Sequence, residues 1–133
     1  MPMVVVLLDE PAETSKIEQL DRVASLRIQG RSLEMTGLKR PLVYERGAWH
    51  APTRSYSVIS IETPVHVHFE DRQGHSKRFG PFERLRVVDG AIRPGNNPQH
   101  VLAWLEQEHW VWHIHGDPVR WQSVVFTDAK PPP

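Results

Sequence analysis

The sequence contains no cysteine, which excludes disulfide frameworks, thiolate catalysis and cysteine-ligated zinc or iron–sulfur sites. It also has no net charge, because 16 basic residues balance 16 acidic ones. A protein that binds nucleic acid usually carries a basic domain or stripe that neutralises phosphates. We therefore expect nucleic acid not to be the partner.

Long apolar runs are missing as well. The run at 3–8 is far shorter than the roughly 20 apolar residues of a membrane span. No basic residues precede it, as they would in a signal peptide. We expect no membrane contact and a cytoplasmic location. The sequence also lacks a Gly-x-Ser-x-Gly elbow, a phosphate loop and a dinucleotide-binding fingerprint.

The length of 133 residues suits one domain. Short runs of alternating apolar and polar residues are separated by turn residues every ~8–12 positions. The clearest hairpin signal is Asp89-Gly90, which favours a type I′ turn. We predict a mainly β (α+β) fold, an antiparallel β-sandwich or rolled β-barrel, as a single domain over 1–128. The proline-rich segment 129–133 is expected to be a flexible tail.

Two segments predict helices. In the first, over 98–108, Asn97 has the position of a cap and Pro98 that of the first helical residue, ahead of an apolar stripe. The second is a short helix over 15–22, where a serine and a glutamate have the spacing of a capping box. We expect the 98–108 helix to pack on the sheet.

Two stretches place histidines and an acidic residue at every second position, PVHVHFED at 64–71 and WVWHIHGDP at 110–118. In the first, His66, His68 and Glu70 share one face of a strand, and two such imidazoles can bind one metal ion. Two histidines and a carboxylate suit Zn²⁺ or Fe²⁺. The alternative is the polar face of a half-buried strand, whose intervening valines and phenylalanine face the core. The sequence leaves both interpretations open.

The His-x-His of PVHVHFE resembles the first metal motif of the cupin family. In cupins a glutamate follows three or four residues after the second histidine and a glycine comes later. Here Glu70 follows His68 after one residue, and the second cupin motif is not visible. The resemblance covers about ten residues and departs at the carboxylate, so we do not assign the chain to the cupins. The alternative function is a small metal-dependent enzyme with a cupin-like barrel that uses the His66/His68 strand motif. Zn or Fe at His66 and His68 would be its cofactor.

Four of the five tryptophans fall between 104 and 121. We predict a last hairpin with strands at 110–115 and 120–126 around a loop at 116–119. Its tryptophan face is either core or a binding surface, since tryptophan and arginine dominate protein interfaces. The predicted binding surface consists of His113, His115, Arg120, Gln122, Trp112 and Trp121.

The absence of catalytic motifs, the balanced charge and this hairpin favour a small non-enzymatic binding or adaptor module without a cofactor. It would act through a protein partner or through self-association, as a homo-oligomer or as a subunit of a larger assembly. Whether the protein is an enzyme stays open at this point, because the metal hypothesis competes with this interpretation.

Overall fold

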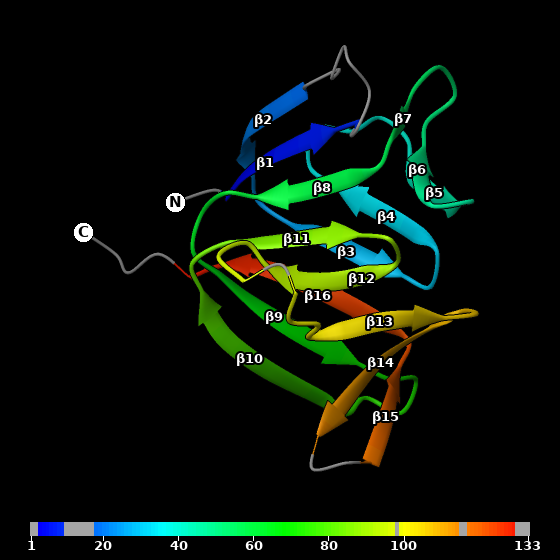
Figure 1. Ribbon diagram of the computed structural model, residues 1–133, viewed down its shortest axis with the longest axis vertical. Helices are drawn as coiled ribbons and strands as arrows, with labels where there is room; N and C mark the ends of the chain where they lie inside the picture. Colours follow the sequence, from blue (N-terminus) through cyan, green and yellow to red (C-terminus); the bar gives the residue numbers. More distant parts are fainter. Residues whose placement is uncertain (1–2, 10–17, 98, 115–116, 130–133) are drawn as a thin grey trace.

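Two antiparallel β-sheets of eight strands each make up the fold (Figure 1). The computed structural model describes residues 3–9, 18–97, 99–114 and 117–129, and for 113, 114, 117 and 118 it describes the backbone. The strand order is β15-β14-β13-β12-β11-β8-β1-β2 in sheet A and β10-β9-β16-β3-β4-β5-β6-β7 in sheet B. The two sheets face each other, which is consistent with the predicted β-sandwich.

The strands have the following bounds. Those of sheet A are β1 (Met3–Leu8), β2 (Glu18–Val23), β8 (Val58–Ile61), β11 (Leu85–Val88), β12 (Ala91–Pro94), β13 (Ala103–Glu106), β14 (His109–Ile114) and β15 (Asp117–Trp121). Those of sheet B are β3 (Leu26–Gln29), β4 (Ser32–Met35), β5 (Leu42–Glu45), β6 (Ala48–His50), β7 (Ser55–Tyr56), β9 (Val65–Glu70), β10 (Ser76–Phe82) and β16 (Ser123–Asp128).

The core lies between the sheets and follows from the two-residue period of the strands. Ile59 and Ile61 of β8 are fully buried from sheet A, and Val67 and Phe69 of β9 are fully buried from sheet B. Trp110 of β14 is also fully buried, and its indole Nε1 donates a hydrogen bond of 3.0 Å to the carbonyl of Gly30. This bond ties a hairpin of sheet A to the β3–β4 turn of sheet B.

The prediction of a helix over 98–108 is wrong for the residues that the structure describes. Ala103 pairs with Ile92 and Trp104 with Ala91, so this segment extends sheet A as β13. Gln107 then has a φ of 55°, which turns the chain into β14 and does not occur within a helix. Pairing with β12 on one side and β14 on the other therefore overrides the local helical signals.

The helix predicted over 15–22 is wrong from residue 18 onward, where β2 pairs with β1 and Leu20 lies opposite Val5. Its first residues fall outside the described part of the chain. Within the described ranges the chain forms strands, turns and loops. They contain no helix with the length and apolar character needed to cross a membrane.

The Asp89-Gly90 turn is confirmed. Val88 pairs with Ala91, and both turn residues have positive φ, 54° and 69°, as a type I′ turn requires. Gly90 accepts this conformation without a Cβ penalty.

The register predicted for the last hairpin is wrong. Ile114 pairs with Asp117 and Trp110 with Trp121, so residues expected in a loop at 116–119 belong in part to β15. The strand expected over 120–126 is divided at Gln122, where the chain leaves sheet A for sheet B.

The packing of β8, a strand of sheet A, against the core can be tested by cavity formation. Replacing Ile59, which is fully buried, by alanine should lower the free energy of unfolding by about 2–5 kcal/mol. The matched change Val43→Ala, at a side chain that is 42% exposed, should cost less than about 0.5 kcal/mol. Urea denaturation followed by tryptophan fluorescence measures both, and equal small losses would contradict the burial of β8.

Candidate protein-binding surface

His66, His68 and Glu70 share the outward face of β9, as the alternation of buried and half-buried residues along this strand shows. His68 Nε2 lies 2.9 Å from the hydroxyl oxygen of Thr127 on the neighbouring strand β16. A Glu70 carboxylate oxygen lies 3.9 Å from a guanidinium nitrogen of Arg27. His66 Nδ1 is buried and has no hydrogen-bond partner among the described residues.

Within the described residues, no three histidine or carboxylate side chains lie close enough together to hold a metal ion. The structure does not test metal binding by the second histidine pair, because His115 lies outside the described residues and the side chain of His113 is not described. The strands of the two motifs are not neighbours, since β9 belongs to sheet B and β14 to sheet A. The metal-dependent enzyme therefore stays a prediction.

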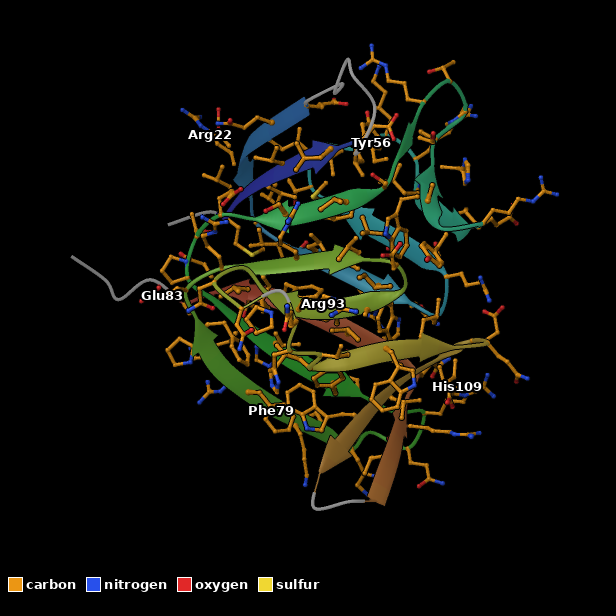
Figure 2. The ribbon with its side chains drawn as sticks, in the orientation of Figure 1. Arg22, Tyr56, Phe79, Glu83, Arg93 and His109 are labelled. Atoms are coloured by element: carbon orange, nitrogen blue, oxygen red, sulfur yellow. The ribbon has the colours of Figure 1, made fainter. Side chains whose placement is uncertain are left out.

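The tryptophan face of the last hairpin packs as core. Trp121 is buried with its ring centroid 6.0 Å from that of Phe69. Trp112 is half-buried and stacks on Phe79 of β10 at 4.3 Å, with the planes only 8° apart. Figure 2 shows Phe79 in the lower part of the molecule, where β10 approaches β14. This stack closes one end of the sandwich between the two sheets.

The six residues of the predicted binding surface do not form one surface as far as they are described. Arg120 is exposed on the outer side of sheet A, where its guanidinium lies 3.5 Å from a Glu106 carboxylate oxygen. Gln122 lies at the crossing between the sheets and lines a pocket on the other side of the molecule. Trp112 and Trp121 belong to the interior.

The outer face of sheet A carries apolar residues that the sequence did not lead us to expect on a surface. The runs MVVVLL in β1 and VISI in β8 are almost continuously apolar. Such runs are typical of strands that are covered on both faces, whereas strands with one wet face alternate. One set of alternate residues packs in the core. The other set, which includes Val6 opposite Ser60 and Leu8 opposite Val58, faces outward.

The cross-strand partners of these residues continue the apolar row across the sheet. Val88 lies opposite Val58, Ala91 opposite Val88, Trp104 opposite Ala91, and Val111 opposite Trp104. None of these side chains belongs to the core cluster between the sheets. We call the following residues the outer apolar face: Val4, Val6, Leu8, Val58, Val88, Ala91, Trp104 and Val111.

The outer apolar face reaches solvent only in part. Val58, Ala91 and Val111 are buried although they point away from the core, and the other five residues of the face are half-buried. Neighbouring side chains on the same side of the sheet therefore cover part of the apolar row. The half-buried members, which include Trp104, are the ones that a partner could contact directly.

Two arginines stand at the centre of this face. Arg86 and Arg93 are opposite each other in register on β11 and β12, the two middle strands of sheet A. Figure 2 looks onto this side of the sheet, with Arg93 near the middle of the view. The two residues place positive charge at the middle of the sheet.

Ion pairs lie toward the rim of the same face. Arg84 Nε lies 3.1 Å from a Glu62 carboxylate oxygen. Glu106 accepts a hydrogen bond of 3.3 Å from the indole N–H of Trp104, besides its ion pair with Arg120. The indole ring is therefore held in place at the edge of the apolar row. The face therefore has an apolar row, a cationic pair beside this row, and ion pairs toward its edges.

The fold and this face define an all-β protein of two antiparallel sheets with one apolar outer surface. Comparison with protein-family models, with curated proteins and with solved structures found no match to the chain. Function must therefore be argued from the residues themselves.

The environment of His68 predicts a dependence of stability on pH. Burial lowers the pKa of His68, and the charges of Arg78 and His66 lower this pKa further, while Glu70 opposes the shift. The unfolded chain, with an ordinary histidine pKa of about 6.5, then takes up the proton before the folded protein does. The stability that neutral His68 contributes is present above about pH 6.5 and is lost as the pH falls below it.

Urea midpoints at pH 7.5 and 5.0 provide the measurement. The urea midpoint should decrease less between pH 7.5 and pH 5.0 in His68→Gln than in the unsubstituted protein. His100→Gln, at an exposed loop position, serves as the control and should leave the drop unchanged. An equal drop in all three proteins would show that His68 does not contribute.

Proposed function

We propose that this protein is a non-enzymatic binding module that holds a partner protein against the outer apolar face. The observation that carries the proposal is the row of outward apolar side chains from β1 to β14, which lies outside the core. Partly exposed apolar side chains that are bordered by polar residues occur at protein-interaction sites.

The distribution of residue types on the face supports a protein partner. Protein interfaces have an apolar centre and a polar rim, and tryptophan and arginine supply most of their binding energy. Trp104 is half-buried, and its hydrogen bond to Glu106 reduces the rotamer freedom that binding would otherwise cost. Trp104 is therefore the expected anchor for the partner.

The central arginine pair indicates the chemistry of the partner. Arg86 and Arg93 place two positive charges on β11 and β12, and electrostatic complementarity favours a partner that carries negative charge at this point. The partner should thus present aspartate or glutamate beside apolar side chains.

A second copy of this chain fits the face less well. In a two-fold contact the same patch meets itself. Because the arginine pair occupies the two middle strands, such a contact would bring four guanidinium groups together at its centre. Like-charge contact of this kind costs several kcal/mol at an interface. We therefore favour a different protein over self-association.

Selection from a random peptide library tests the proposal, because it does not require the partner to be identified first. Peptides selected on the intact protein should be enriched in Asp or Glu next to apolar residues. Arg86→Glu/Arg93→Glu should weaken their binding at least tenfold, and Trp104→Ala should cost about 2 kcal/mol or more of binding free energy. Val43→Ala, on the outer side of sheet B, is the matched control and should bind normally.

Three outcomes would contradict the proposal. The first is a set of peptides without acidic enrichment, and the second is equal binding to the charge-reversed variant. The third is a dimer in light scattering that dissociates on Arg93→Glu, since it would make a second copy the occupant of the face.

A further inference from the structure

A pocket of about 340 Å³ opens on the opposite side of the molecule, over the outer face of sheet B. Residues of β3 and β4 form its floor, and the loop after β9, the crossing at Gln122 and the β13–β14 turn form its walls. Figure 2 shows His109 beside that turn. The pocket is lined by Arg27, Gln29, Gly30, Ser32, Glu34, Arg72, Glu108, His109 and Gln122. Its volume is within the range of small-molecule sites.

The walls of the pocket are held in place by contacts between the two sheets. Glu108 approaches so closely that a Cβ added to Gly30 would lie 2.9 Å from its carboxylate and 3.3 Å from its carbonyl oxygen. The buried hydrogen bond from Trp110 to the Gly30 carbonyl fixes the same junction. Arg31 Nε lies 3.6 Å from Glu108. These contacts hold the wall formed by the β13–β14 turn against the β3–β4 turn.

Two arginines supply positive charge from different elements. Arg72 forms no ion pair or hydrogen bond with another described side chain. Arg27 is held only by long contacts, 3.5 Å to the Ser123 hydroxyl oxygen and 3.9 Å to Glu70. Both guanidinium groups therefore have N–H donors to offer to a carboxylate in the pocket, a geometry for which arginine is well suited.

Glu34 supplies negative charge on the floor of the pocket. Its partner in register is Arg27, yet no ion pair joins the two side chains in the described part of the chain. Glu108 differs, because it already has an ion-pair partner in Arg31. Glu34 is thus the carboxylate that faces the ligand. A purely anionic ligand would meet its repulsion, and a purely cationic ligand would meet that of the arginines.

We propose that this pocket binds a small zwitterion of the amino-acid class. Its carboxylate lies against Arg27 and Arg72, and its ammonium group lies against Glu34. Gln29, Gln122 and Ser32 offer amide and hydroxyl groups to a polar side chain of the ligand. This site is independent of the outer apolar face, because it lies on the other sheet.

Titration calorimetry with three probes tests the charge pattern. L-Glutamine carries both charges, propionate carries only the carboxylate, and propylammonium carries only the cation. L-Glutamine should bind at least tenfold more tightly than either single-ended probe, since each of those loses one charge-assisted interaction.

Two charge-removing variants separate the ends of the site. Arg72→Gln should weaken the binding of L-glutamine and of propionate by about tenfold. Glu34→Gln should weaken the binding of L-glutamine by a similar factor. It should leave the binding of propionate unchanged or make it tighter. Arg46→Gln, at the exposed β5–β6 turn, is the matched control and should bind as the unsubstituted protein does. Thermal unfolding confirms that each variant is folded.

The proposal is overturned if L-glutamine does not bind at millimolar concentration, or if propionate binds as tightly as L-glutamine. It is also overturned if Glu34→Gln leaves L-glutamine binding unchanged, because the site would then recognise an anion alone. Failure of the peptide selection on sheet A would not affect any of these results.

Discussion

The hydrogen bond from the Trp110 indole to the Gly30 carbonyl links the two surfaces of this protein. It is buried and joins residues 80 positions apart in the chain, one on each sheet. With Trp110 directed into the core, its neighbour Val111 must face outward, where it completes the outer apolar face. The same bond holds the β13–β14 turn against the β3–β4 turn, and this junction forms a wall of the polar pocket.

Local signals predicted much of the fold but not its register. The alternation of apolar and polar residues and the Asp89-Gly90 turn were sufficient to predict an antiparallel β architecture, because both depend on neighbouring residues. The segment at 98–108 failed for the opposite reason. Its cap and apolar stripe suit a helix, but Ala103 finds a pairing partner in Ile92, and that contact cannot be recognised locally. The last hairpin failed because the chain changes sheet at Gln122.

The candidate sites were harder to predict from the sequence than the strands were. The apolar run MVVVLL forms the strand β1. One sequence cannot tell whether both of its faces are covered within the same chain, because coverage depends on strand order. The polar pocket joins residues from four separate segments, so no spacing within one segment could have indicated it. The histidine motif, in contrast, was conspicuous in the sequence because an outward strand face places polar residues at every second position.

The two surfaces meet in a single hairpin, and this raises the question of whether they are coupled. Trp104 and Val111 face outward on β13 and β14, while Glu108 and His109 at the turn line the pocket. Coupling between two sites requires an element with two arrangements that the ligands bind unequally. Here the hairpin is fixed by a buried hydrogen bond, by the close approach of Glu108 to Gly30, and by the ion pair of Glu108 with Arg31. Because three contacts hold this hairpin in place, we expect the two proposed ligands to bind without affecting each other.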